Sequence, residues 1–368
     1  MKITDIRVLV RVRAMDGTHR NPRFVWRAKQ TLLVFVFTDD GRIGTGEAWS
    51  DGGGAGSIAA FIAEDLKPRL LGRDPHLVEG FWREALDTAI VSTRRSQTAA
   101  AMSAVDIALW DLKGQAAGLP LWRLLGGDGR GALAYASGGL YREEQSAAEF
   151  GAEYTAFASQ GFRAVKIKVG GAPVATDIAR IAALRQGLGE GPLLMIDAVS
   201  NCDVPHALRL ARAAAPYDIT WFEQPVPIDD LEGQARIAAA SPIPLCGNEN
   251  EYGIERFRRL METGAIHYVQ FDPVISGGIT MGRKIAALAE SRHLPVTLHH
   301  SNSIVSMAAN LHLAWALPNA HSVEYHVIHQ PLFERAPAGF LALGDGRIAP
   351  DERPGLGLDL RDLAAEAQ

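Results

Sequence analysis

The chain has 368 residues, which is long enough for one large domain and a smaller one. Its hydrophobic content of 47% is that of an ordinary soluble globular protein, and its net charge of −5 argues against a nucleic-acid partner. It shows no signal-peptide segment and no apolar run of about 18 residues, so we expect no membrane partner. Two cysteines in a chain of this length make no disulfide framework, which predicts a cytoplasmic protein.

The first 126 residues show strand patterns followed by helix patterns. Strands are predicted at residues 2–13, 31–38 and 42–49, and helices at 57–70, 77–92 and 96–117. Strands and helices that do not alternate indicate an α+β domain, which we assign to residues 1–126. The glycine-rich stretch at 41–56 lacks both the P-loop and the dinucleotide fingerprint, and we interpret it as a flexible loop.

From residue 133 onward, short apolar runs alternate with alanine-rich helical stretches. Eight such units predict an α/β fold with a TIM barrel, which we assign to residues 127–329. The Pro- and Gly-rich segment at 330–368 is expected to leave the barrel and to return to the N-terminal domain. The predicted barrel strands are 133–136, 164–169, 193–196, 219–222, 244–247, 268–271, 296–298 and 321–325.

Potentially reactive side chains recur along the barrel region at nearly one interval. One strand, one helix and their loops take roughly 25 residues, and catalytic groups gather where barrel strands end. From Lys168 onward the intervals are 29, 26, 26, 23, 27 and 25 residues. The positions are Lys166 and Lys168, Asp197, Glu223, Glu249, Asp272, His299 and Glu324.

Three carboxylates follow three successive predicted strands: Asp197, Glu223 and Glu249. Adjacent strands lie about 4.8 Å apart, so these groups converge and repel one another unless a cation lies among them. Oxygen ligands suit Mg²⁺, which we therefore predict as the cofactor. Glu190 and Glu251 are competing carboxylates that do not share this register.

Lys166 and Lys168 lie on one face of a predicted strand, because side chains alternate along it. The apolar Ile167 between them would face the helices, so the lysines would face the barrel interior. Neighbouring ammonium groups lower each other's pKa, which can leave one lysine neutral enough to act as a base.

Asp272 and His299 end predicted strands six and seven, and a carboxylate beside an imidazole raises its basicity. His300 is an alternative to His299 that the spacing alone does not exclude. Glu324 ends strand eight and, if protonated, could donate a hydrogen bond to a substrate carboxylate. His321 and His326, which flank it, are expected to be structural. A divalent cation between two bases would acidify a proton next to a carboxylate and stabilise the enediolate.

Several motifs match one known family over nearly the whole chain. The segments AMSAVDIALWDLKGQ at 101–115 and PLWRLLG at 120–126 match its N-terminal signature. Its K-x-K motif falls on 166–168, its His–Asp dyad on His299 and Asp272, and its glutamate after strand eight on Glu324. Its proline four residues before the histidine is Pro295 here, which selects His299. Its metal carboxylates fall on Asp197, on Glu223 within WFEQP and on Glu249 within GNEN.

On these motifs the chain resembles the mandelate racemase subgroup of the enolase superfamily. The resemblance implies an α+β capping domain over a modified (β/α)7β TIM barrel. It also implies Mg²⁺-dependent removal of the proton α to the carboxylate of a small-molecule substrate. Lys168 and His299 would be bases on opposite faces, and Lys166 would neutralise the substrate carboxylate. Homo-oligomers from dimer to octamer are expected.

Two positions depart from the family pattern. Val199 stands where many members carry Asn, two residues after the first metal ligand, so mandelate-like recognition of a hydroxyl is not expected. Asn248 intervenes between Gly247 and Glu249, where the ligand commonly follows Gly directly. The distance from Pro244 to Glu249 is the usual one, so we expect ligation to persist.

The resulting prediction is dehydration of an acid sugar to a 2-keto-3-deoxy acid. The alternative is a racemase or epimerase, because both bases are present, and the remote alternative is a catalytically silent metal-binding scaffold. The segment at 13–29 lies where the family has its specificity loop. Within it we predict His19, Arg23 and Trp26 as substrate-binding residues.

Overall fold

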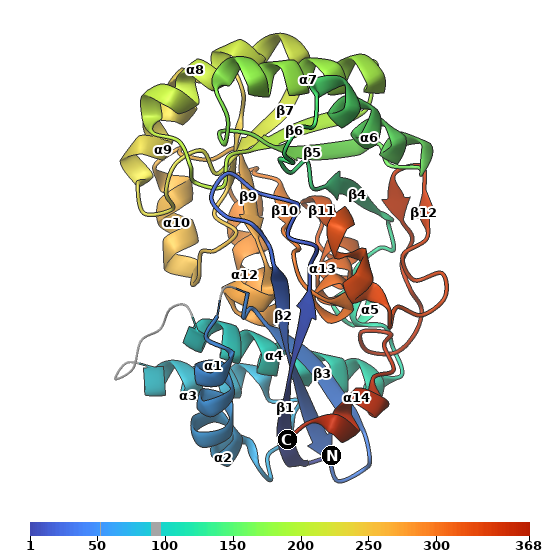
Figure 1. Ribbon diagram of the computed structural model, residues 1–368. Helices are drawn as coiled ribbons and strands as arrows, with labels where there is room; N and C mark the ends of the chain where they lie inside the picture. Colours follow the sequence, from blue (N-terminus) through green and yellow to red (C-terminus); the bar gives the residue numbers. More distant parts are fainter. Residues whose placement is uncertain (52, 90–96) are drawn as a thin grey trace.

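The computed structural model describes residues 1–51, 53–89 and 97–368. It consists of a three-stranded antiparallel sheet with its helices and a closed parallel barrel of eight strands (Figure 1). The predicted α/β fold, a modified TIM barrel with an α+β capping domain, is therefore confirmed. No helix in these described ranges combines the length and the apolar character that crossing a membrane requires.

The N-terminal sheet has the order β1 (Ile3–Ala14), β2 (Ala28–Thr38), β3 (Ile43–Ala48). Strand β2 is central, and its unbroken apolar run is buried because the sheet packs against α4. The parts of our predicted helices at 90–92 and 96 lie outside the described residues. The helical segments are α1 (Ala55–Phe61), the π-helix η1 (Ile62–Leu66), α2 (Lys67–Leu70), α3 (Val78–Ala89), α4 (Gln97–Ala117) and α5 (Leu121–Leu124).

The glycine-rich stretch that we interpreted as a flexible loop contains strand β3. A Cβ at Gly44 would lie 2.3 Å from the carbonyl oxygen of Ala108, and one at Gly46 would lie 1.9 Å from that of Ala104. The loop interpretation is wrong for this part, because the two glycines allow the backbone of α4 to touch the sheet.

The barrel strands are parallel and follow chain order, and the pairing of β11 with β4 closes the ring. After β11 the chain forms the 3-10 segment η3 (Val327–Phe333), so seven helical connections join eight strands. The strands are β4 (Ala132–Ser137), β5 (Ala164–Lys168), β6 (Leu193–Asp197), β7 (Ile219–Glu223), β8 (Leu245–Gly247), β9 (Tyr268–Phe271), β10 (Val296–Leu298) and β11 (Ala320–His326). The connections contain α6 (Ala147–Ser159), α7 (Val174–Leu188), α8 (Val204–Ala214), η2 (Ala215–Tyr217), α9 (Leu231–Ala240), α10 (Ile254–Glu262), α11 (Pro273–Ser276), α12 (Gly278–Glu290) and α13 (Ile304–Ala316).

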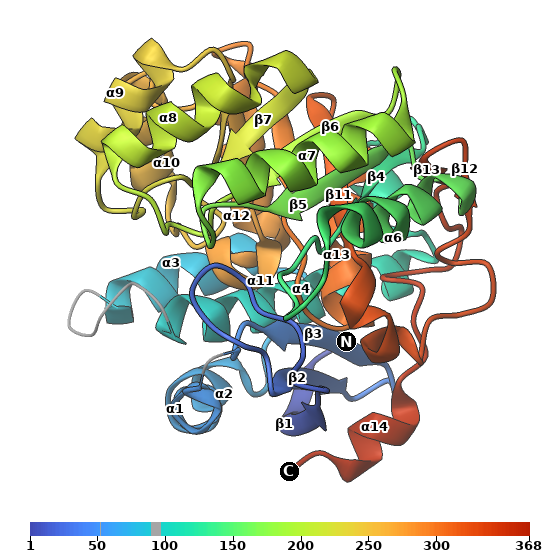
Figure 2. The same ribbon diagram turned by 45° about the horizontal axis from the view of Figure 1, so that its top comes forward.

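Buried carboxylates of the capping domain bind the N-termini of barrel helices. Glu47 on β3 accepts hydrogen bonds from Ser303 Oγ at 2.7 Å and from Ser306 N at 2.9 Å, at the start of α13. Asp106 on α4 accepts one from Thr280 N in α12 at 3.0 Å, and α4 lies against α11 and α12 (Figure 2). Helix N-termini favour negative charge, but burial outweighs these bonds and raises the pKa of Glu47 to about 7.

The C-terminal segment returns to the capping domain. Its strands β12 (Leu343–Gly344) and β13 (Arg347–Ile348) extend the barrel sheet beside β4, and α14 (Arg361–Glu366) follows. The backbones of Val8 and Gln368 then exchange hydrogen bonds of 2.8 and 3.2 Å, so that the C-terminus lies beside β1 of the capping domain (Figure 1).

Candidate active site

A cavity of about 410 Å³ lies between the C-terminal ends of the barrel strands and the capping domain. From the barrel it is lined by Lys168, Val199, Glu249, Asn250, His299, Ser301, Glu324 and His326. From the capping domain it is lined by Asn21, Phe24, Val25, Trp26, Arg27, Ala28, Trp49 and Asp51. Most of the reactive positions that recur along the sequence therefore converge on this one cavity or the strand ends beneath it.

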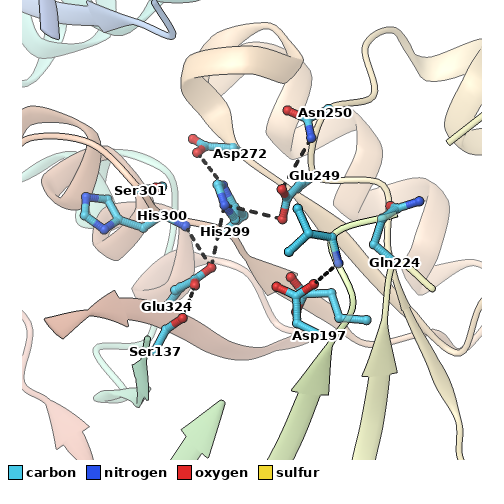
Figure 3. A network of polar contacts seen from close by, with 12 residues as sticks. Ser137, Asp197, Gln224, Glu249, Asn250, Asp272, His299, His300, Ser301 and Glu324 are labelled. Atoms are coloured by element: carbon cyan, nitrogen blue, oxygen red, sulfur yellow. Dashed lines mark hydrogen bonds and ion pairs between the residues drawn. The ribbon is translucent and has the colours of Figure 1, made fainter. Parts of the chain in front are cut away.

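The strand register brings the predicted metal carboxylates to one end of the barrel. Lys168 pairs with Asp197 across β5 and β6, and Asp197 pairs with Glu223 across β6 and β7. Glu249 follows β8 and reaches the cavity wall, with the Asn250 amide 3.3 Å from its Oε1 (Figure 3). Asp197 and Glu223 are buried.

The two lysines neutralise these carboxylates. Lys166 Nζ lies 2.7 Å from Glu223 Oε1, 3.1 Å from Glu324 Oε1 and 3.7 Å from Asp197 Oδ2. Lys168 Nζ donates to Asp197 Oδ2. Burial opposes both ammonium groups, but the carboxylates outweigh it and raise the pKa of Lys166 and of Lys168. Lys166 does lower the pKa of Lys168, as expected, but the nearer carboxylates outweigh this effect, so our expectation of a lysine neutral enough to act as a base is wrong for this arrangement.

The negatively charged carboxylates still repel one another. Burial and the neighbouring Asp197 raise the pKa of Glu223 to about 8, although Lys166 opposes the shift. Among the described residues, no three His, Cys, Asp or Glu side chains surround one point as they would a bound ion. Each carboxylate is turned instead toward a cationic side chain of the protein. The donor chemistry still fits Mg²⁺, because Asp197, Glu223 and Glu249 offer only oxygen ligands from neighbouring strands.

His299 follows β10, which is three strands away from β5 and its lysines around the barrel. Its Nδ1 is 2.9 Å from Asp272 Oδ2, and its Nε2 is 3.3 Å from Glu249 Oε2 and 3.8 Å from Glu324 Oε2 (Figure 3). Burial lowers its pKa, but the three carboxylates outweigh burial and raise it to about 9. His300 is turned away, with Nε2 3.2 Å from Ser303 O, so the geometry favours His299.

Glu324 is ionised in this surrounding. Burial opposes ionisation, but Lys166 and His299 outweigh it and hold the pKa of Glu324 well below its usual value. Ser137 Oγ also donates to Oε1, and Tyr135 OH lies 3.3 Å from Oε2. Our expectation that Glu324 is protonated and donates a hydrogen bond to a substrate carboxylate is therefore wrong for this charge arrangement.

The backbone adopts the left-handed region beside each predicted metal carboxylate. Val199 has φ 51°, Gln224 φ 39° and Asn248 φ 77°. Val199 N donates to Asp197 Oδ1 at 2.8 Å, and Asn248 N donates to Gln224 Oε1 at 2.7 Å. A β-branched residue such as valine is a true outlier in this region, and such strain gathers at functional sites. At the third strand, the left-handed turn accommodates the additional residue Asn248.

The loop between β1 and β2 reaches over the cavity. Arg20 anchors it, because its backbone exchanges hydrogen bonds of 3.0 and 2.8 Å with that of Tyr141. Of the three predicted substrate-binding residues, Trp26 lines the cavity. His19 instead lies 3.3 Å from Asp16, and Arg23 is exposed; neither lines the cavity. Arg27, Trp49 and Asp51 also line the cavity, and no spacing along the sequence marks them. His326, which we expected to be structural, lines the cavity as well, two residues after Glu324 in the same strand.

Comparison with known proteins agrees with this geometry. The "Enolase C-terminal domain-like" family matches residues 149–364, and the "Mandelate racemase / muconate lactonizing enzyme, N-terminal domain" family matches residues 8–126. The chain belongs to the mandelate racemase/muconate lactonizing enzyme family of the enolase superfamily.

Relatives within this family share about a third of their residues with the chain. Arabinonate dehydratase of Saccharolobus solfataricus is 33% identical over 90% of this chain and 89% of its own. The 3,6-anhydro-alpha-L-galactonate cycloisomerase of Streptomyces coelicolor is 33% identical over 97% and 95%. The structure of a racemase from Streptomyces coelicolor A3(2) with bound magnesium has a TM-score of 0.90 at 32% identity, with both chains fully covered. Dehydratases and cycloisomerases of acid sugars thus stand among the relatives of this chain.

Proposed function

We propose that this protein is a Mg²⁺-dependent dehydratase of an acid sugar. One observation carries the proposal: the cavity holds Lys168 and His299 on its wall, with the three carboxylates Asp197, Glu223 and Glu249 at the same end of the barrel. The relatives named as dehydratase and cycloisomerase, and the magnesium in the racemase structure, support it.

The three carboxylates would hold the Mg²⁺ ion. When bound there, it would withdraw charge from the substrate carboxylate and so acidify the proton on the adjacent carbon. Lys166 is buried beneath the cavity, and its ammonium group would balance the negative charge of the substrate.

Lys168 and His299 would divide the proton transfers. Lys168 is held as an ammonium by Asp197 here, so it can accept the α-proton only when Asp197 has another cationic partner. His299 carries a proton on an imidazole whose Nδ1 is fixed by Asp272, and it would protonate the departing β-hydroxyl. The product would be a 2-keto-3-deoxy acid and water.

Racemisation or epimerisation remains the second candidate, because the same two residues come from separate barrel strands, Lys168 from β5 and His299 from the end of β10. A proton removed by one and returned by the other would invert the α-carbon without loss of water. The two reactions therefore differ in their products and not in their first step.

Incubation with Mg²⁺ in D₂O against a panel of mono- and diacid sugars and simple α-hydroxy acids tests the proposal. Loss of water with a 2-keto product, detected by mass spectrometry and NMR, is expected and would name the substrate. Deuterium at an inverted α-carbon without water loss would establish the racemase or epimerase. No reaction after removal of Mg²⁺ with EDTA, and its return on addition of Mg²⁺, is the expected metal dependence.

We further infer a homo-oligomer located in the cytoplasm. The free cysteines Cys202 and Cys246 are both buried, as suits a reducing compartment. Light scattering coupled to size-exclusion chromatography measures the number of subunits directly.

A further inference from the structure

The last residue of β11 is a histidine that the proposed chemistry does not use. Side chains alternate along the strand, so His326 lies on the same inward face as Glu324. It is only 2% exposed and lines the cavity, yet neither of its ring nitrogens has a hydrogen-bond partner among the described residues. A buried polar group that has lost its contact with water and found no other partner is energetically unfavourable. This cost would be recovered if a bound molecule supplied the partner.

The orientation of the His326 ring is fixed by its neighbours. His329 stacks on it, with ring centroids 3.8 Å apart and an interplanar angle of 15°. Trp26 meets both histidine rings edge-on at centroid distances of 5.5 Å. His329 is held in turn, because its Nδ1 lies 3.5 Å from Ser301 Oγ, which also accepts from Lys29 Nζ at 3.3 Å. A ring fixed in advance loses little entropy when a ligand binds.

The surroundings also set the hydrogen-bonding character of the ring. Burial lowers the pKa of His326 well below its usual value; Glu324 opposes the shift, and Lys168 and Lys29 add to it. A neutral imidazole presents one donor and one acceptor. A hydroxyl group has the same pair of capacities, whereas a carboxylate can only accept. The donor and the acceptor of the neutral His326 ring therefore match a hydroxyl group better than a carboxylate.

We propose that His326 binds a hydroxyl group on the carbon chain of the substrate and thereby selects polyhydroxylated acids over simple α-hydroxy acids. This inference rests on the proposed function and adds a specificity-determining residue to it. His326 would bind the substrate without transferring a proton. Its partner would be a hydroxyl beyond the carbon atoms that react, on the side of the cavity formed by Trp26.

The test uses His326→Phe, which keeps an aromatic ring for His329 and Trp26 but removes both hydrogen-bonding atoms. The matched control is His321→Phe in the same strand. His321 does not line the cavity and packs against the rings of Trp221 and Tyr268. His326→Asn keeps a donor and an acceptor and should recover part of the activity. Each protein is assayed with the best sugar acid and with analogues that lack one distal hydroxyl each.

The wild-type protein should lose about 10- to 100-fold in kcat/KM when one particular hydroxyl is removed, because the buried ring of His326 is then left without its partner. His326→Phe should lose a similar factor on the complete substrate but lose nothing further on that analogue, while His321→Phe behaves as wild type. A His326→Phe protein that still discriminates at every hydroxyl would overturn the inference.

The failure of the proposed function gives a different pattern. In that case the wild-type protein neither exchanges the α-proton nor releases water with any acid. Calorimetric titration of the same acids in the presence of Mg²⁺ then tests the binding role of His326 without requiring any reaction. Tighter binding to the wild-type protein than to His326→Phe, confined to acids that carry the distal hydroxyl, would support it. Equal binding or no binding would refute it.

Discussion

The two walls of the cavity are built in different ways. The barrel wall takes its reactive groups from the ends of different strands, such as Lys168 on β5 and Glu324 on β11, and the positions of these groups follow from strand register. The capping wall takes Trp26 and Arg27 from the loop before β2, and Trp49 and Asp51 from the segment after β3. No repeat along the sequence relates these four residues to one another.

The two walls of the cavity should therefore have different functions. The barrel wall concentrates buried charge that is neutralised in pairs, as with Lys166 and Glu223, and such paired charge suits proton transfer. The capping wall presents two indole rings and partly exposed polar groups, which suit the recognition of a variable substrate chain. We therefore expect substitutions of the paired charges in the barrel wall to abolish chemistry. Substitutions in the capping wall, or of the uncharged His326 beside it, should change the choice of substrate.

The largest effect should come from separating the two proton transfers of the barrel wall. Lys168→Ala should reduce α-proton exchange in D₂O by about 1000-fold, because it removes the group that we assign as the base for the α-proton. His299→Asn should retain exchange and lose the release of water, since it removes the acid and leaves the base. Lys284→Ala, which removes a surface ion pair with Glu79, is the control. Loss of exchange in His299→Asn with exchange intact in Lys168→Ala would reverse the two roles.

The contact of Glu47 on β3 with the start of α13 should make the free energy of unfolding depend on pH. The pKa of Glu47 is raised to about 7 by burial, from an ordinary value of 4.5, so the folded protein binds more protons between these values. Its contribution to the free energy of unfolding is therefore fully present below pH 4.5 and is lost as the pH rises through about 7. By linkage this loss is roughly 3 kcal/mol.

Urea unfolding of wild type and Glu47→Gln at pH 5 and pH 8 measures that contribution. The glutamine does not titrate, so the variant should lose much less stability between the two pH values than wild type does. Glu79→Gln on the exposed side of α3 is the control and should follow wild type. The same fall in all three proteins would assign the pH dependence to other groups.

A smaller effect should distinguish the two arginines of the β1–β2 loop. Arg27 lines the cavity and Arg23 does not. With a diacid substrate, Arg27→Ala should raise KM about 10-fold, equivalent to about 1.4 kcal/mol, because a guanidinium group recognises a distal carboxylate. Arg23→Ala should leave KM unchanged. The opposite result would restore Arg23, the residue predicted from sequence, and would mean that the loop closes further when substrate binds.

The sequence predicted the barrel wall because register converts one-dimensional spacing into proximity. Lys168, Asp197 and Glu223 are neighbours in the sheet for the same reason that they recur along the chain. Helix α13 is buried on nearly all sides between the barrel and β3, so its sequence has no polar face to mark the helical period.

The sequence did not predict the charge states or the capping wall. The lysine pKa values depend on which carboxylate lies nearest, and the three contacts of Lys166 join three different strands. The direction in which Arg23 and Arg27 point depends on the anchoring of the loop by Arg20 at Tyr141, a contact between segments far apart in the chain. The spacing of residues along the chain predicts neither the lysine pKa values nor the directions of these arginine side chains.

The smallest effect concerns the strain beside the first carboxylate. Val199 has φ 51° and lines the cavity, and asparagine tolerates this conformation far better than a β-branched residue. Val199→Asn should therefore raise the free energy of unfolding by about 1 kcal/mol, with Val165→Asn in the buried part of β5 as a destabilising contrast. The new amide would also face the cavity, so activity on substrates with an additional hydroxyl should change while α-proton exchange persists. A Val199→Asn protein that is less stable than wild type would show that the apolar contacts of the valine outweigh its backbone strain. Val199 would then contribute to the packing of the barrel and not to the binding of substrate.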